Sequence, residues 1–107
     1  LINTPELLNN VSERGSQLTL GLNQLNTKHQ LFKAVRGQGL LIGAVLTDKY
    51  AGRSGELVKL TMQMGLMTLV AGPNVHRFAP PLIISESEIN DALERLDQAY
   101  AAFNKQL

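Results

Sequence analysis

The sequence contains no cysteine and no long hydrophobic run. The absence of cysteine excludes disulfides, thiolate metal sites and cysteine catalysis, and it is compatible with a cytoplasmic location. No apolar stretch approaches the ~20 residues that a membrane-spanning helix needs, so we expect no membrane partner. Aromatic residues make up only 5% of the chain and the net charge is +1. These values disfavour nucleic-acid binding, which typically uses a basic surface and stacking aromatic residues.

The 107 residues are enough for one domain with its own hydrophobic core. Hydrophobic residues make up 44% and charged residues 18%, as in ordinary globular proteins. The first five residues have no start methionine and no charged region followed by an apolar segment, so they are not a signal peptide. We therefore expect residues 1–107 to form a single domain, and we expect the chain to be a fragment of a longer protein.

Long amphipathic helices are predicted near both ends of the chain. A threonine, a proline and an acid at residues 4–6 are typical of a helix start. Apolar residues at spacings of three and four then predict a helix that ends at about His29. Ser85 followed by Glu88 is a capping box that opens the last helix. Two glycines inside the first helix, Gly15 and Gly21, predict close packing or a bend there.

The first half of the middle region predicts a hairpin. Residues 31–36 and 40–46 are apolar segments separated by a Gly-Gln-Gly turn. The second segment carries no charge, which predicts a central strand that is buried on both faces. A glycine in its middle, Gly43, predicts that another element lies close to it.

A short helix and a second hairpin are predicted for the remainder. The apolar pattern of residues 57–64 predicts a helix that ends at Gly65. Residues 66–71 and 75–79 predict two antiparallel strands joined by a Gly-Pro-Asn turn. The whole order predicts an α+β two-layer sandwich with long first and last helices, in which helices cover one face of a small, mostly antiparallel sheet.

Arg77 is the residue that we predict to bind a ligand. Its β-branched and aromatic neighbours favour an extended backbone, so Arg77 shares one face with Val75 while His76 and Phe78 lie on the other. The prolines at residues 80–81 make an interior position in the sheet unlikely and favour an edge strand or a strand end, which places Arg77 near a rim. There its planar guanidinium could bind a carboxylate or phosphate in bidentate fashion. The alternative is that Arg77 pairs with a surface Asp or Glu.

No other pattern predicts catalysis or metal binding. His29 and His76 have no acid at a metal-ligand or triad spacing, so we expect surface or half-buried histidines. Residues 37–43 resemble a dinucleotide loop but precede a strand instead of a helix. Residues 52–55 lack the lysine of a phosphate loop, and turn formation and helix capping explain them. The three methionines are predicted to fill the core.

Two motifs taken together resemble a known family. Residues 36–43 read R-G-Q-G-L-L-I-G, and residues 77–82 read R-F-A-P-P-L. This pair, followed by Ser85 and Glu86, resembles the carboxyl-terminal domain of the class III aminotransferases, and is most similar to the acetylornithine and succinylornithine branch. The resemblance covers nearly the whole chain, from Asn3 to the last helix.

The resemblance implies that residues 1–107 are the C-terminal (small) domain of a larger enzyme that uses pyridoxal 5'-phosphate. That enzyme would transfer an amino group between N-acetylornithine or N-succinylornithine and 2-oxoglutarate or glutamate, in arginine metabolism, and would be a homodimer. Arg77 would be the small-domain arginine that binds the substrate carboxylate. The Schiff-base lysine and the other cofactor-binding residues come from the preceding large domain in this family. This chain by itself is therefore expected to bind no cofactor and to be inactive, and its own lysines do not match the family's lysine motif: Lys28, Lys33, Lys49, Lys59 and Lys105.

Two other functions stay open from the residues alone. A free-standing α+β ligand-binding or regulatory module would also carry a rim arginine without a catalytic group. A structural fragment would associate through surface that a large domain normally covers, which the leucine-rich first helix and the apolar central strand allow. A native polypeptide with the mass of this chain would indicate the module, and a much larger mass would indicate a detached aminotransferase domain. The size of the chain in solution as a function of its concentration tests the structural fragment.

Overall fold

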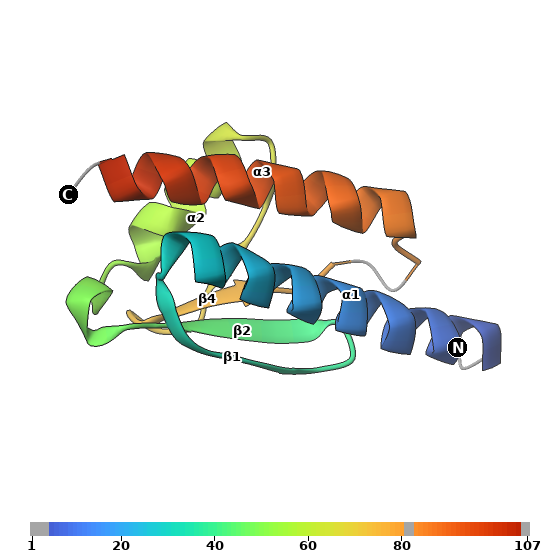
Figure 1. Ribbon diagram of the computed structural model, residues 1–107. Helices are drawn as coiled ribbons and strands as arrows, with labels where there is room; N and C mark the ends of the chain where they lie inside the picture. Colours follow the sequence, from blue (N-terminus) through green and yellow to red (C-terminus); the bar gives the residue numbers. More distant parts are fainter. Residues whose placement is uncertain (1–4, 81–82, 106–107) are drawn as a thin grey trace.

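The computed structural model describes residues 5–80 and 83–105. Within these ranges the chain forms helices packed on one antiparallel sheet (Figure 1). The helices are α1 (Pro5–His29), η1 (Asp48–Tyr50, a 3-10 helix), α2 (Ser54–Gln63) and α3 (Glu86–Lys105). The strands are β1 (Phe32–Gln38), β2 (Leu41–Leu46), β3 (Leu69–Val70) and β4 (Val75–Phe78). The predicted α+β two-layer sandwich with long first and last helices is confirmed.

The sheet has the strand order β1-β2-β4-β3, and each neighbouring pair is antiparallel. β2 is an interior strand, as predicted, but only one of its faces is buried. Ile42, Ala44 and Leu46 point into the core, whereas Leu41 is 57% exposed. The prediction of burial on both faces was wrong because α1, α2 and α3 all lie on one side of the sheet (Figure 1).

The core lies between the sheet and the helix layer. α3 contributes side chains without solvent exposure, and Leu96, Tyr100 and Phe103 are the largest of them. α1 contributes Leu22, and β2 contributes Ile42 from the opposite layer. Burial of each such apolar side chain stabilises the fold by roughly 1.5–3 kcal/mol relative to its exposure. The first and last helices, α1 and α3, are therefore integral parts of the domain.

α1 packs closely at both of its predicted glycines. A Cβ atom at Gly15 would overlap the backbone carbonyl of Gly39, in the β1–β2 turn. A Cβ atom at Gly21 would overlap the side chain of Leu93 on α3. Gly39 itself has a φ of +60°, a conformation that glycine adopts without steric cost. The glycines of α1 therefore allow the helix to contact both the hairpin and α3.

Helix ends follow the sequence signals. The Ser85 Oγ atom accepts a hydrogen bond from the Glu88 N–H at 3.2 Å, and the Ser85 N–H donates to the Glu88 carboxylate at 2.9 Å. The capping box is thereby confirmed, and these bonds lower the pKa of Glu88. Gly65 follows α2 with a φ of +82°, as its predicted role as a helix terminator requires. Thr4, the predicted cap of α1, lies outside the described residues.

Two local predictions differ from the structure. β3 is shorter than the strand predicted for residues 66–71, although the hairpin with β4 is present. Met62 and Met67 are 59% and 82% exposed, so the prediction that all three methionines fill the core was wrong. Only Met64 packs against the core. Met62 points outward because it lies two positions from Met64, which puts it on another face of the helical turn.

Candidate functional site

β4 places Arg77 on the face of the sheet that the helices leave open. His76 and Phe78 are buried under the helix layer, whereas Val75 is half-buried and Arg77 is exposed on the opposite face. This alternation is the predicted one. β4 lies between β2 and β3 and ends at Phe78, just before Ala79 and Pro80. Arg77 is one residue from a strand end, as predicted, but the prediction that disfavoured an interior position in the sheet was wrong, because β3 pairs with the outer side of β4.

The guanidinium of Arg77 forms no hydrogen bond or ion pair with any residue of the ranges 5–80 and 83–105. The alternative prediction, pairing with a surface Asp or Glu, is thus not realised within these ranges. An unpaired guanidinium presents five N–H donors in one plane, which match the two oxygens of a carboxylate. The arrangement is chemically suited to holding an anionic group over the open face.

His76, the neighbour of Arg77, lies in a chain of buried hydrogen bonds. Its Nδ1 atom is 3.2 Å from the Tyr100 hydroxyl, and its Nε2 atom is 2.7 Å from the Thr68 hydroxyl. The Thr68 hydroxyl is 2.8 Å from that of Thr61, which donates to the Val58 carbonyl at 2.9 Å. This series of hydrogen bonds links β4 to α3 on one side and to α2 on the other.

The last bond of this chain fixes the direction of all the others. A hydroxyl group has one hydrogen, so Thr61, which donates to a carbonyl, must accept from Thr68. Thr68 in turn must accept from the Nε2–H of His76, and the unprotonated Nδ1 of His76 then accepts from Tyr100. His76 is therefore held as the neutral Nε2–H tautomer. Burial lowers its pKa to about 3, in agreement with a neutral ring.

Both histidines are more buried than predicted. His76 has no solvent exposure and His29 is only 8% exposed. The Nε2 atom of His29 lies 2.6 Å from a carboxylate oxygen of Asp97, and this contact is the main cause that lowers the pKa of Asp97. Asp97 comes from α3, far along the chain, so local sequence spacing did not reveal this partner of His29. No group of three potential metal ligands occurs among the residues that the structure describes.

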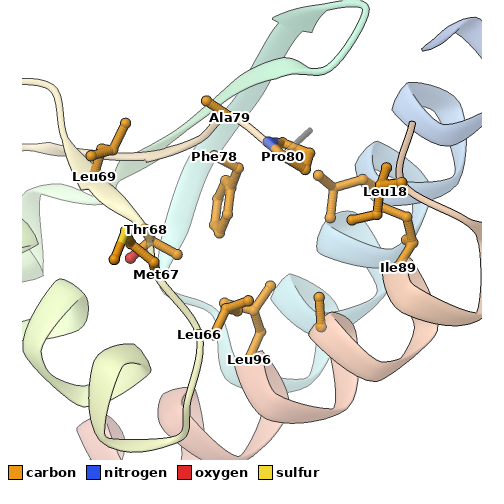
Figure 2. Close-up of a pocket in the computed structure, with 12 residues that line it drawn as sticks. Leu18, Leu66, Met67, Thr68, Leu69, Phe78, Ala79, Pro80, Ile89 and Leu96 are labelled. Atoms are coloured by element: carbon orange, nitrogen blue, oxygen red, sulfur yellow. The ribbon is translucent and has the colours of Figure 1, made fainter. Parts of the chain in front are cut away.

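An apolar cavity of about 370 Å³ lies beside the end of β4 (Figure 2). Leu18 of α1, Phe78 of β4, and Ile89 and Leu96 of α3 are among its lining residues. No charged side chain of the described ranges lines it, so it suits an apolar group and not an anion. Sequence reasoning did not predict this cavity, because its walls come from segments that are distant along the chain.

The remaining candidates have structural roles. Residues 52–55, for which the sequence predicts a turn and not a phosphate loop, connect η1 to α2 and contact the β3–β4 turn. The Gly52 N–H donates to the Asn74 side chain at 2.6 Å, and the Ser54 hydroxyl donates to the Gly72 carbonyl at 2.8 Å. Turn formation therefore accounts for this segment, although α2 begins without a side-chain cap. In the described ranges no helix is long and apolar enough to cross a membrane.

Comparison with known proteins gives consistent results. The profile of the aminotransferase class-III family matches residues 1–100. Acetylornithine aminotransferase of Shewanella oneidensis is 48% identical over 102 residues, which are 95% of this chain and 25% of that protein. Succinylornithine transaminase of Yersinia enterocolitica is 47% identical over 96 residues, which are 90% of this chain and 23% of that protein.

The fold also matches a solved structure. N-acetylornithine aminotransferase from Stenotrophomonas maltophilia superimposes with a TM-score of 0.94 at 39% sequence identity. The match covers 97% of this chain and 29% of that one. The chain thus spans about a quarter of the length of the relatives it matches.

Proposed function

This chain belongs to the class III aminotransferase family, and from this premise we propose that it is the C-terminal small domain of a longer, cytoplasmic aminotransferase. The full-length protein would transfer an amino group between N-acetylornithine or N-succinylornithine and 2-oxoglutarate or glutamate. The names and identities of the two bacterial relatives support this substrate class. The preceding large domain of the same polypeptide and a second subunit would be its partners.

Class III aminotransferases use pyridoxal 5'-phosphate, which supplies an electron sink to the reacting carbon. The residues of this chain do not fit that group by themselves. A lysine that forms an imine with a cofactor is typically desolvated or placed next to another cation, but the five lysines here are all exposed: Lys28, Lys33, Lys49, Lys59 and Lys105. We therefore assign the cofactor-binding residues to the preceding part of the full-length protein, and we expect this chain alone to be inactive.

The part of the reaction that this chain performs is the binding of a substrate carboxylate by Arg77. The observation that carries this proposal is the unpaired guanidinium on the open face of the sheet. Two parallel N–H···O bonds to one carboxylate fix both the position and the orientation of a substrate. Positioning of this kind lowers a reaction barrier because the reacting atoms are already aligned when chemistry begins.

Substitution of Arg77 in the full-length protein tests the proposal. We expect Arg77→Ala to raise KM for glutamate and 2-oxoglutarate about 100-fold, since a charge-assisted pair contributes roughly 3 kcal/mol. The absorption spectrum of the bound cofactor should not change, because Arg77 holds substrate and not cofactor.

Arg53→Ala is the matched control for this experiment. Arg53 is ion-paired with Glu56 at 2.8 Å at the start of α2, on the helix side of the molecule. We expect its KM values to stay within twofold of the parent. Equal KM values for the Arg77→Ala variant and the parent protein would contradict the proposed role.

A further inference from the structure

Two of the five arginines lack a partner among residues 5–80 and 83–105, and both lie on the open face of the sheet. The other three form ion pairs with acids within four positions along the chain: Arg14 with Glu13, Arg53 with Glu56 and Arg95 with Asp91. Arg36 on β1 and Arg77 on β4 are exposed and form none. The pairing of the other arginines shows that the two free ones are distinguished by their location.

The register of the sheet brings Arg36 and Arg77 into one row. Arg36 is opposite Gly43 of β2, and Gly43 is opposite Arg77 of β4. Directly opposed residues of antiparallel strands point to the same face. Two strand spacings separate the arginine Cα atoms by about 10 Å, a span over which two long side chains can reach a common group.

Gly43, which lies between the two arginines in this row, has no side chain of its own. A Cβ atom there would already lie 3.1 Å from the Cγ1 atom of Val75, tighter than ordinary van der Waals contact. The close approach predicted at this glycine is thus made by β4. No side chain of residue 43 therefore stands between Arg36 and Arg77, and both guanidiniums can reach a small anionic group above the sheet.

Apolar side chains lie beside this row. Leu41 and Leu69 are 57% and 48% exposed, and Val45 and Val75 are half-buried beside the row. Two neighbouring positive charges repel each other. This repulsion is stronger beside apolar side chains when water is excluded, because the effective dielectric constant is then lower. An anion bound between them removes the repulsion and satisfies donors of both guanidiniums.

We propose that Arg36 and Arg77 together bind one carboxylate group of a dicarboxylic substrate above Gly43. This rests on the proposed function of Arg77 and adds a second residue that binds the same carboxylate. Neither arginine takes part in bond making; each donates hydrogen bonds to the same carboxylate.

Variants of Arg36 in the full-length protein test this. We expect Arg36→Met to raise KM for 2-oxoglutarate about 10-fold, with kcat changed less than twofold, because uniform binding is lost. Arg36→Lys should give an intermediate KM, since lysine keeps the charge but not the planar fork. Lys33→Met is the matched control: Lys33 lies on the same strand but pairs with Asp48 at 3.3 Å, and its removal should leave KM unchanged.

A double-mutant cycle tests whether the two arginines share one carboxylate. If they do, the fold increase in KM for Arg36→Met/Arg77→Met stays below the product of the fold increases for the two single variants. The reason is that loss of one arginine already weakens the hydrogen bonds of the other to the same carboxylate. The inference would be overturned if the fold increase in KM of the double variant equals the product of those of the single variants. It would also be overturned if Arg36→Met has the same KM as Lys33→Met. A lower melting temperature with unchanged KM would overturn it as well, and would show that Arg36 pairs with an acidic side chain of the protein. If Arg77→Ala leaves KM unchanged, the proposed function itself fails; if only the Arg36 variants do so, this inference alone fails.

Discussion

At the residue scale, the hydrogen-bond chain through His76 specifies a single protonation state inside the core. Every donor in it has one acceptor, from Tyr100 through His76, Thr68 and Thr61 to the Val58 carbonyl. A fully satisfied buried network favours one packing arrangement, because any rotation leaves a donor or acceptor without a partner. The backbone of β4, which carries Arg77 on its other face, is thereby held against both α2 and α3.

Removal of one hydroxyl measures the contribution of this chain. We expect Tyr100→Phe to lower the free energy of unfolding by about 1–3 kcal/mol, because the buried Nδ1 atom of His76 loses its donor. Tyr50→Phe is the control, since the Tyr50 hydroxyl makes a longer, partly buried bond of 3.3 Å to Asn104. Urea unfolding of both variants checks this. An equal decrease in the free energy of unfolding for both variants would contradict the expected cost of removing the Tyr100 hydrogen bond to His76.

The sequence predicted which face each residue of β4 occupies but not what His76 contacts. Alternation along a strand is a local property, and the pattern around Arg77 made it visible. The partners of His76 lie 8 and 24 positions away, and no local spacing relates them. The prediction for Arg77 was therefore possible at the level of its face, whereas its role as a carboxylate-binding residue stays a prediction.

At the scale of elements, the contact between α1 and the β1–β2 turn depends on Gly15. The carbonyl of Gly39 occupies the place where a Cβ atom of residue 15 would be. Because this neighbour is backbone and not a flexible side chain, it has little freedom to move. The packing distance between the first helix and the first hairpin is therefore set by one missing methyl group.

Two glycine substitutions separate packing from helix propensity. We expect Gly15→Ala to destabilise the domain by about 3 kcal/mol through overpacking against the turn. Gly55→Ala, in the first turn of α2, should stabilise it by about 0.5–1 kcal/mol, because nothing lies within 4 Å of its added Cβ and alanine favours helix. Thermal unfolding of both variants gives the comparison. A Gly15→Ala variant as stable as Gly55→Ala would contradict the described packing.

Helix and strand boundaries were predictable where their signals are local. The capping box at Ser85, the terminator Gly65 and the end of α1 at His29 were each identified from adjacent residues and are present. β3 was predicted too long because its apolar composition extends beyond the two residues that pair with β4. Pairing depends on the partner strand, and composition does not report it.

At the scale of the whole molecule, buried neutral and hydrogen-bonded groups make the fold sensitive to acid. The pKa of His76 is about 3 in the folded chain, below the ordinary value of 6.5. As pH falls from 6.5 toward 3, the unfolded chain takes up a proton at this residue and the folded chain does not. Stability therefore falls by up to about 1.4 kcal/mol for each pH unit in this window. Asp97, whose pKa is lowered in the folded chain, adds a loss of the same sign at lower pH.

The upper part of this window isolates the histidine. Between pH 6.5 and 5, above the range where the carboxylates titrate, we expect the urea midpoint of the parent chain to fall with pH. The midpoint of His76→Gln should fall less steeply, because glutamine does not titrate. The same slope in both proteins would show that the acid sensitivity arises from other groups.

The one-sided arrangement of the layers could not be predicted from the apolar strand alone. An uncharged run such as residues 40–46 is compatible with burial on both faces or with one open apolar face. The order of helices and hairpins predicted a single covered face, and α1, α2 and α3 all lie on that side of the sheet (Figure 1). The exposed leucines of the open face, Leu41 and Leu69, are the surface that we expect the rest of the full-length protein to cover.

The position of α3 has a consequence for synthesis of the chain. Its buried residues Leu96, Tyr100 and Phe103 complete the core, yet they leave the ribosome after α1, α2 and all four strands. Until they emerge, the inner sides of α1 and the sheet have nothing to pack against and remain in contact with water. The core therefore cannot be completed before α3 is available, and a nascent chain that ends before α3 exposes apolar surface of the kind that chaperones bind.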